Sequence, residues 1–326
     1  MRAVVCKAWG PPEGLAVDHV PEPVPGAGDV LIRVRACGVN FADALIVQGK
    51  YQEKPPLPFT PGLEVAGDVV SMGEDVGGLG TGQRVVALCA TGGYAEAATA
   101  PGAVTVRIPD AMPYETAAGF MVAYGTAHIG LEHRAKLRRG ETLLVHGAGG
   151  GVGLAAVEVG KAIGATVIAA AGSEDKRALA RRHGADHVID YRAGKFKDVV
   201  KALTDGRGAD VVFDPVGGQV FAQSMRCIAW EGRLLVIGFA AGDIPQVPAG
   251  LVLVKNISMV GVYWGAYRVH EPAIITESLR RLFAWYEEGT LRPVISETLP
   301  LERAAEAMQR LLRREARGKV VLTTEA

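Results

Sequence analysis

The chain has 326 residues, with 35 Lys and Arg against 35 Asp and Glu, so its formal net charge is zero at pH 7. At roughly 100–200 residues per domain, this length predicts two domains with large apolar cores. A neutral chain excludes a general attraction to nucleic acid or to an anionic membrane, and we expect a small-molecule partner. The four cysteines form no CxxC pair, which indicates a reducing compartment, and we expect the cytoplasm.

Short β segments separated by Pro and Gly fill the first ~120 residues. The strand candidates are Ala3–Cys6, Asp29–Ala36, Glu64–Met72, Arg84–Leu88 and Tyr94–Thr99. This pattern predicts a partly open, mostly antiparallel β-barrel, which we assign to residues 1–122.

From Ala123 the pattern changes to strands that alternate with helices at α/β spacing. The strand candidates are Leu143–His146, Thr166–Ala170, His187–Ile189, Asp210–Phe213, Arg233–Gly238 and Ile257–Val262, and the helix candidates are Val152–Ile163, Glu174–His183, Lys195–Leu203 and Gly218–Ile228. These predict a doubly wound parallel (Rossmann) sheet over residues 123–264. Residues 265–326, with helices over Pro272–Glu288 and Leu301–Arg314 and a strand at Lys319–Leu322, are expected to return to the first domain.

A cluster of glycines joins the first of these strands to its helix. Glycines at such a turn allow a tight bend, let phosphate oxygens approach the backbone and let the helix pack on the strand. The helix N-terminus offers free N–H groups to a pyrophosphate. A flexible turn is the alternative, but the strand–turn–helix context favours a dinucleotide site. The residues expected to hold the cofactor are Gly147, Gly149, Gly150, Gly151, Val152 and Gly153.

The choice of dinucleotide depends on the end of the next strand, Thr166–Ala170. NAD enzymes place Asp or Glu there, about 20 residues after the glycines, to hold the ribose 2′-hydroxyl, but this chain continues with Ala171–Ser173. Lys176 and Arg177 follow, and Tyr191 ends the third strand, so cations and hydroxyls are available for a 2′-phosphate. Solvated charges on a helix face are the alternative for both cations. We expect NADPH, held by Gly172, Ser173, Lys176 and Tyr191.

Several segments together carry a family resemblance. Ala36–Asp43, Pro61–Gly67, the glycine turn and Asp210–Gly218, in this order, resemble the medium-chain dehydrogenase/reductase superfamily, and within it the zinc-free quinone oxidoreductase branch that includes zeta-crystallin. The resemblance extends over nearly the whole chain, to Gly318–Leu322. It implies a GroES-like catalytic domain joined to a Rossmann nucleotide domain.

Two positions depart from the zinc alcohol dehydrogenases of the same superfamily. Those enzymes carry a metal-binding Cys followed by His where this chain has Asn40–Phe41, and a His before Glu where it has Leu63–Glu64. A catalytic zinc needs three N, S or O protein ligands, which these positions do not supply. Cys89 also stands alone where those enzymes cluster cysteines around a structural zinc. We therefore expect no metal, and we interpret Cys37 as a small buried apolar residue.

Hydride transfer without a metal needs an acceptor that is already electron-poor, such as a quinone or a conjugated carbonyl, held by positioned hydrogen bonds. The resemblance puts Asn40 near the nicotinamide and Tyr51 at the substrate mouth, where its hydroxyl would orient a carbonyl or donate a proton. Asp43 follows in the same segment as Asn40, where it would contact the substrate. Each residue has a structural alternative: Asn40 bonds to backbone in a turn, Tyr51 packs beside a Pro-rich loop, and Asp43 holds the loop, which is the interpretation that we favour for it.

Further positions match the family's cofactor contacts. Thr126 falls next to the nicotinamide, and Phe239 follows a strand at the carboxyl edge of the sheet, where its backbone would meet the carboxamide. Lys319 would reach a cofactor phosphate, with a solvated side chain as the alternative. Asp214–Gly217 ends another strand at this edge and either lines the cofactor crevice or forms a plain turn.

Together these features predict an NADPH-dependent, zinc-independent oxidoreductase of quinones or related electrophilic carbonyls. A reductase of activated C=C bonds in enals, enones or acyl thioesters is the alternative enzyme, although Lys50 and Lys54 are the extent of the basic cluster near Tyr51. An NADPH-binding protein with little turnover is the non-enzymatic alternative. Ile257–Val262 and the aromatic stretch after it resemble the segment through which family members join their nucleotide-domain sheets, so we expect a homodimer.

Overall fold

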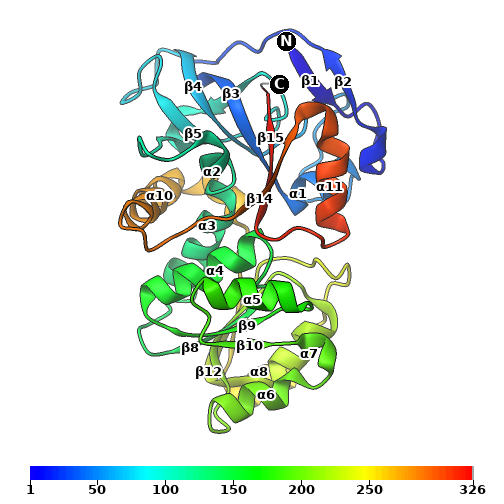
Figure 1. Cartoon of the computed structure of the whole chain (residues 1–326), viewed down its shortest axis with the longest axis vertical. Coiled ribbons are helices and arrows are strands. Elements are labelled where there is room, and N and C mark those ends of the chain that lie inside the picture. Colours follow the sequence, from blue (N-terminus) through cyan, green and yellow to red (C-terminus); the bar gives the residue numbers. More distant parts are fainter. Residues whose placement is uncertain (325–326) are drawn as a thin grey trace. The chain divides into compact units, whose positions relative to one another are not determined.

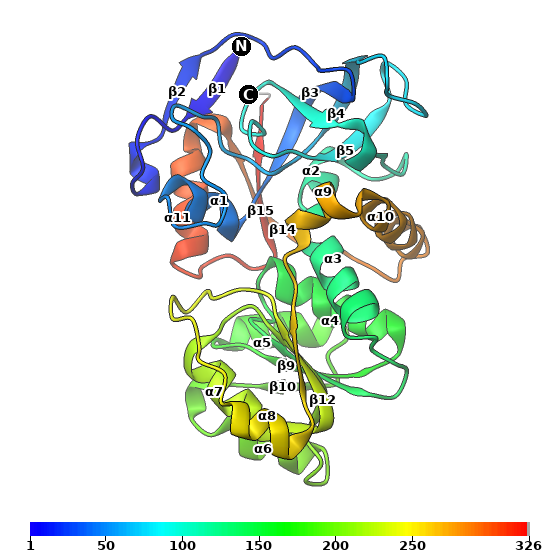
Figure 2. The ribbon, with the colours of Figure 1, turned by 180° about the vertical axis from the view of Figure 1, so that it is seen from behind.

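The computed structural model describes residues 1–324 and divides the chain into two compact units (Figures 1 and 2). The first unit contains Met1–Val122, Tyr267–Phe283 and the described residues from Pro293 on. The second contains Ala123–Ala266 and Ala284–Arg292. The expected division assigned all of residues 265–326 to the first domain, whereas Ala284–Arg292 packs within the second unit. The chain therefore passes between the units more often than expected.

A seven-stranded sheet forms the first unit, in the order β14-β15-β3-β4-β5-β7, with β6 paired to β3. Its strands are β3 (Asp29–Val39), β4 (Glu64–Met72), β5 (Arg84–Leu88), β6 (Ala97–Pro101), β7 (Thr105–Arg107), β14 (Ile295–Pro300) and β15 (Lys319–Thr323). All pairs are antiparallel except β14 with β15. Strands β1 (Arg2–Val5) and β2 (Ala16–His19) form a separate antiparallel pair. The predicted mostly antiparallel β domain is confirmed.

Strands β4 and β5 coincide with the predicted segments, whereas β6 begins at Ala97 instead of Tyr94. The backbone of Tyr94 is engaged with a loop and with β1: its N–H donates to the Pro61 carbonyl at 2.9 Å, and its carbonyl accepts the N–H of Val4 at 2.8 Å. These bonds hold Tyr94 outside the ladder, with its side chain fully buried in the core of the unit.

The helices of the first unit are α1 (Phe41–Val47), α2 (Tyr114–Ala118), α9 (Tyr267–His270), α11 (Ala304–Leu312) and most of α10 (Pro272–Glu287). Helix α11 contacts α1, β14 and β15, so it covers the part of the sheet where the C-terminal strands join β3. Its buried side chains, Ala304, Ala307 and Met308, belong to the same apolar core as Ile32 and Leu322.

The second unit is a six-stranded parallel sheet in the order β10-β9-β8-β11-β12-β13. Its strands are β8 (Thr142–His146), β9 (Thr166–Ala170), β10 (His187–Ile189), β11 (Ala209–Asp214), β12 (Ile228–Val236) and β13 (Ser258–Gly261), and its helices are α3 (Met121–His128), α4 (Gly151–Ile163), α5 (Glu174–Arg182), α6 (Phe196–Leu203), α7 (Gly218–Cys227) and α8 (Ala249–Lys255). In sequence order the strands run 3-2-1-4-5-6, which is the Rossmann arrangement. The predicted doubly wound sheet is confirmed.

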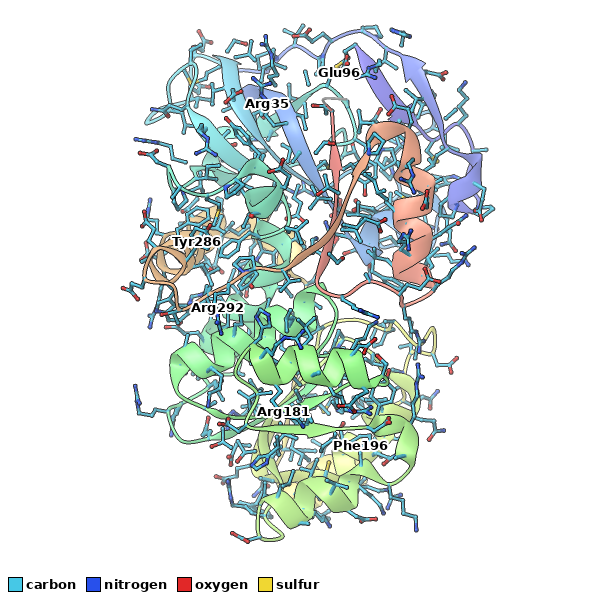
Figure 3. All side chains as sticks on the ribbon, in the orientation of Figure 1. Arg35, Glu96, Arg181, Phe196, Tyr286 and Arg292 are labelled. Atoms are coloured by element: carbon cyan, nitrogen blue, oxygen red, sulfur yellow. The ribbon has the colours of Figure 1, made fainter. Side chains whose placement is uncertain are left out.

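Helices cover both faces of this sheet. Successive side chains of a strand point to opposite faces, so neighbouring residues of one strand pack against different helices. Leu144 belongs to a buried cluster with residues of α6, α7 and α8. Its neighbour Leu143 faces α4, where a Cβ on Gly160 would lie 2.5 Å from the Leu143 side chain. Phe196, labelled in Figure 3, belongs to the same buried cluster as Leu144. Its ring packs edge-on against the His146 ring, with the ring centroids 5.2 Å apart.

Candidate cofactor-binding site

The turn between β8 and α4 bends through Gly147, whose φ of 61° lies in the left-handed region. A Cβ on Gly153 would lie 2.2 Å from the carbonyl oxygen of Gly147, so the first turn of α4 packs directly on the bend. The helix begins at Gly151, and the N–H groups of its first turn, including that of Val152, lack intrahelical partners as in every α-helix. A helix terminus of this kind binds a pyrophosphate.

Gly149 makes room for a side chain of α5 and not for the bend of the turn itself. A Cβ there would lie 2.5 Å from the Cβ of Lys176 and 2.7 Å from its Cγ. Lys176 lies in the first turn of α5, so the bare α-carbon of Gly149 leaves room for its aliphatic stem. The structure thus brings Lys176 beside the glycine turn.

The loop after β9 meets the loop after β10 at Gly172. A Cβ on Gly172 would lie 2.9 Å from the hydroxyl of Tyr191 and 2.6 Å from Nε of Arg192. Ser173 follows as the N-cap residue of α5. The structure therefore gathers predicted residues around Gly172 and adds Arg192, which sequence reasoning missed. Its place directly after Tyr191, at the end of the third strand of the Rossmann pattern, was the available signal.

Arg177 is a second cation that the sequence suggested for a 2′-phosphate, but in the structure it is paired with carboxylates. Its guanidinium pairs with Glu174 at 2.7 Å and with Asp190 at 2.8 Å. Within residues 1–324, no carboxylate pairs with the exposed guanidinium of Arg192, although the backbone N–H of Arg192 donates to the Asp190 carboxylate at 2.9 Å. The cation available beside Gly172 is thus Arg192, and the expectation for Arg177 is corrected.

Phe239 lies at the carboxyl edge of the sheet, three residues after β12. A Cβ on Gly217 would lie 3.1 Å from the Phe239 ring, so this segment packs on the turn after β11. Asp214 holds that turn, because its carboxylate accepts the N–H groups of Val216 at 2.8 Å and Gly217 at 3.0 Å. Of the two readings for Asp214–Gly217, these bonds support the strand-ending turn. Thr126 is buried in α3.

A buried polar cluster surrounds the start of α1 in the first unit. Asn40 caps this helix, and its backbone N–H donates to the Asp43 carboxylate at 2.8 Å. The hydroxyl of Tyr94 donates to the same oxygen at 3.1 Å. Burial raises the pKa of Asp43 from 3.8 to about 7, against the opposing effect of these donors. Asp43 therefore has the structural role that we favoured, fixing the turn at Asn40.

Lys319 corrects another expectation. Its ammonium donates to Oε1 of Glu64 at 2.7 Å and to Oδ1 of Asn40 at 2.7 Å, and the side chains of the ion pair are 8% and 0% exposed. An ammonium held between two buried acceptors is not free to reach a cofactor phosphate, and it is not a solvated side chain either. Lys319 is instead the counter-charge of Glu64.

Tyr51 is partly buried and packs against the apolar core of the first unit. This contact agrees with the packing role that the sequence left open for it.

The four cysteines are buried thiols. Burial raises the pKa of Cys37 well above its usual value and that of Cys89 to about 12, and the Cys37 thiol donates to the Glu64 carbonyl at 3.0 Å. Across residues 1–324, no group of three His, Cys, Asp or Glu side chains is placed to hold a metal.

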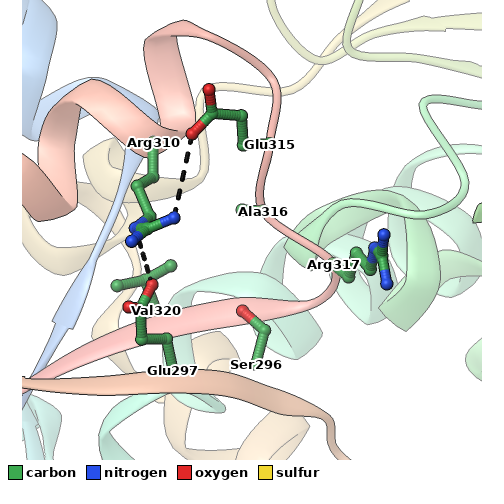
Figure 4. A pocket seen from close by; sticks show the side chains of 7 residues that line it. All are labelled: Ser296, Glu297, Arg310, Glu315, Ala316, Arg317 and Val320. Atoms are coloured by element: carbon green, nitrogen blue, oxygen red, sulfur yellow. Dashed lines mark ion pairs between the residues drawn. The ribbon is translucent and has the colours of Figure 1, made fainter.

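A surface hollow of about 270 Å³ opens on the first unit (Figure 4). It is lined by Ser296, Glu297, Arg310, Glu315, Ala316, Arg317 and Val320. The guanidinium of Arg310 pairs with Glu297 at 2.8 Å and with Glu306 at 3.2 Å, so this cation of the hollow is already paired with carboxylates. None of the predicted site residues lines it, and it is not the candidate site.

Comparison with known proteins agrees with this fold. Residues 151–282 match the family model described as zinc-binding dehydrogenase, and residues 26–110 match that of the alcohol dehydrogenase GroES-like domain. Over 326 residues the chain is 42% identical to the quinone oxidoreductase-like protein 2 homolog of Nematostella vectensis, covering 99% of this chain and 89% of that protein. The chain belongs to the quinone oxidoreductase branch of the medium-chain dehydrogenase/reductase superfamily.

Two solved structures that contain NADPH have the same fold. Mycobacterial Rv1454c complexed with NADPH matches with a TM-score of 0.94 at 32% identity, covering 99% of this chain and 100% of that one. Escherichia coli quinone oxidoreductase complexed with NADPH matches with a TM-score of 0.92 at 28% identity, with the same coverage. The predicted pairing of a GroES-like domain with a Rossmann domain is confirmed.

Proposed function

We propose that this protein is an NADPH-dependent, zinc-independent oxidoreductase that passes a hydride to a quinone or a related electrophilic carbonyl. The observation that carries the proposal is the arrangement around Gly172, where Tyr191, Arg192 and Lys176 gather and Ala171–Ser173 supplies no carboxylate. A dianionic 2′-phosphate is best held by cations and hydroxyls, whereas an acid at this strand end would select the free 2′-hydroxyl. Bound NADPH would supply the hydride.

The chain's own residues bind and orient this cofactor. The free N–H groups at the start of α4 hold the pyrophosphate, and Arg192 and Lys176 neutralise the 2′-phosphate. The family resemblance assigns the nicotinamide to Thr126 and Asn40. Asn40 is buried in the first unit and Thr126 in the second, so each side chain is held in a fixed position by its own unit.

Zinc independence rests on the residues at the family's metal positions. Asn40 and Leu63 stand where the zinc enzymes carry metal ligands. Asn40 already holds Glu64 and Lys319 with its amide, and the buried Cys37 thiol has a raised pKa that disfavours the thiolate a metal needs. Without a Lewis acid, the acceptor must be electron-poor by itself, which favours quinones and conjugated carbonyls.

Arg192→Gln tests the cofactor assignment. Loss of charge-assisted hydrogen bonds worth about 1.5–3 kcal/mol should raise the Kd for NADPH roughly 10- to 100-fold, with the Kd for NADH nearly unchanged, in a fluorescence titration. Arg181→Gln, an exposed arginine farther along α5, is the matched control and should leave both constants unchanged. Equal weakening of NADPH and NADH by Arg192→Gln would contradict a 2′-phosphate role.

A panel of quinones, enals and crotonyl thioesters tests the acceptor. The proposal expects quinones to give the highest kcat/KM with NADPH, with and without a chelator. Preference for enals or thioesters would move the assignment to activated C=C bonds, and tight NADPH binding with no turnover on any acceptor would refute the enzymatic reading.

We also propose that the chain forms a homodimer. Strand β13 is the edge of the parallel sheet, and Leu253 and Val254 of the adjacent α8 are 75% and 64% exposed. An open strand edge beside exposed apolar side chains favours pairing with another chain. Light scattering should give twice the chain mass, falling to a monomer for Leu253→Glu; a monomeric wild type would refute the pairing.

The cellular compartment of the protein is a further proposal. The four free cysteines favour a reducing environment, for which we propose the cytoplasm. Among the helices of residues 1–324, none is long and apolar enough to cross a membrane. Fractionation of the native host, with the protein appearing in a disulfide-forming compartment, would contradict the assignment.

A further inference from the structure

The fully buried carboxylate of Glu64 is the centre of a hydrogen-bond network. Glu64 begins β4, and its side chain is 0% exposed. Oε1 accepts Nζ of Lys319 at 2.7 Å and Nδ2 of Asn40 at 2.9 Å, and Oε2 accepts the backbone N–H of Val122 at 2.8 Å. Three segments far apart in the sequence therefore converge on one carboxylate.

The network fixes which way the Asn40 amide points. Its nitrogen donates to the Glu64 carboxylate, and its oxygen accepts from the Lys319 ammonium. A flipped amide would set its NH₂ against an ammonium, which has no acceptor, and its oxygen against a carboxylate, which has no donor. The ion pair thus leaves Asn40 a single orientation to present to a ligand.

The same carboxylate holds the beginning of α3. Val122 is the second residue of this helix, and its N–H is among those without an intrahelical partner. A negative charge at a helix N-terminus is favoured by the helix dipole. Thr126 lies four residues farther on, so it shares a helix face with Val122. Glu64 therefore holds the first turn of the helix that carries Thr126.

The backbone around Glu64 leaves space for this arrangement. A Cβ on Gly38 would lie 2.3 Å from Oε1 of Glu64 and 2.2 Å from the carbonyl oxygen of Ala118. Any side chain at position 38 would displace the carboxylate or the end of α2. A glycine there allows β3, β4 and the helices to meet around one buried charge.

We infer that Glu64, with Lys319 as its counter-charge, is a positioning residue for hydride transfer. It acts through Asn40, the residue of the same unit that the proposed function puts at the nicotinamide, and touches neither cofactor nor substrate itself. This inference rests on the proposed function. It predicts that removing the charge loosens the nicotinamide end of the cofactor and leaves its phosphate end bound, because the side chains of Glu64 and Lys319 bond to Asn40, to Val122 and to each other, and to none of the residues proposed to hold the phosphates.

Glu64→Gln and Lys319→Gln test the inference in the full-length protein, with Asp68→Asn as the matched control. Asp68 lies on the same strand and pairs with Arg35 at 2.8 Å, away from this network. The measurements are folding by circular dichroism, the Kd for NADPH, the fluorescence anisotropy decay of bound NADPH, and kcat with the best acceptor.

The expected result is a fall in kcat of at least tenfold, about 1.4 kcal/mol, in either Gln variant, with faster nicotinamide motion and a Kd within about threefold of the wild type. Asp68→Asn should match the wild type. Unchanged kcat and anisotropy in folded Gln variants would overturn the inference and leave Glu64 a purely structural residue.

Two outcomes separate this inference from the proposed function. If the wild type reduces none of the acceptors, the proposed function fails, while the anisotropy of bound NADPH still decides whether Glu64 positions the nicotinamide. If Glu64→Gln does not fold, Lys319→Gln provides the test, because it removes the counter-charge and keeps a donor facing Asn40.

Discussion

Replacing Asp43 by asparagine is expected to stabilise the protein above neutral pH. The carboxyl is fully buried, and burial raises its pKa to about 7 even though Asn40 and Tyr94 donate to it. The folded pKa lies above the unfolded value of 3.8, so the folded state binds the proton more tightly. Stability is therefore lost as pH rises from about 4 to about 7. Asparagine keeps an oxygen for both donors and never ionises.

The magnitude follows from the shift of about three pKa units, which is worth about 4 kcal/mol once the group is fully ionised. About 2 kcal/mol of this should develop between about pH 5.5 and 8.5. Urea unfolding at these two pH values measures it: the stability of Asp43→Asn relative to the wild type should rise by that amount. Asp68→Asn is the control, because the Tyr114 hydroxyl and Arg35 outweigh desolvation and hold the pKa of Asp68 below its usual value. A pH-independent effect of Asp43→Asn would show that burial does not raise the pKa of Asp43.

Two further substitutions test the close contacts directly. Gly153→Ala should abolish NADPH binding and lower the Tm, because its Cβ would lie 2.2 Å from the Gly147 carbonyl oxygen; Gly150→Ala, with its nearest contact at 3.5 Å, should keep the Tm in the same calorimetric scan. Lys319→Met should lower the free energy of unfolding by about 3–5 kcal/mol, because it leaves the Glu64 carboxylate buried without its counter-charge. The double variant Glu64→Gln/Lys319→Met should recover part of that loss in urea titrations, and strictly additive losses would contradict the pairing.

The parts of the fold that depend on local pattern were predictable from the sequence. The turn from Gly147 to Gly153 was predictable because its glycines lie only a few positions apart in the sequence. Its position between a strand and a helix indicates a dinucleotide-binding turn. The alternation of strands and helices after Ala123 likewise predicted the parallel sheet, since each strand is an apolar run of its own. The boundary of β6 was missed because Tyr94 is bound by residues distant in the sequence.

The candidate site was less predictable, because partners of charged side chains are decided by tertiary contacts. Lys319 pairs with Asn40, 279 positions away, and no periodicity links them. Arg177 and Arg192 are equivalent as sequence letters, yet Asp190 pairs with the guanidinium of the first and leaves that of the second available. Which cation is free can be read from the structure alone.

The most direct test of the central claim is the loss of nicotinamide absorbance when the purified protein is mixed with a quinone and either NADPH or NADH, with and without a chelator. Metal-free hydride transfer from NADPH predicts oxidation that persists with the chelator, with a kcat/KM for NADPH at least about tenfold above that for NADH. Preference for NADH would contradict the 2′-phosphate site around Gly172 and Arg192. Activity lost to the chelator and restored by zinc would contradict metal-free hydride transfer.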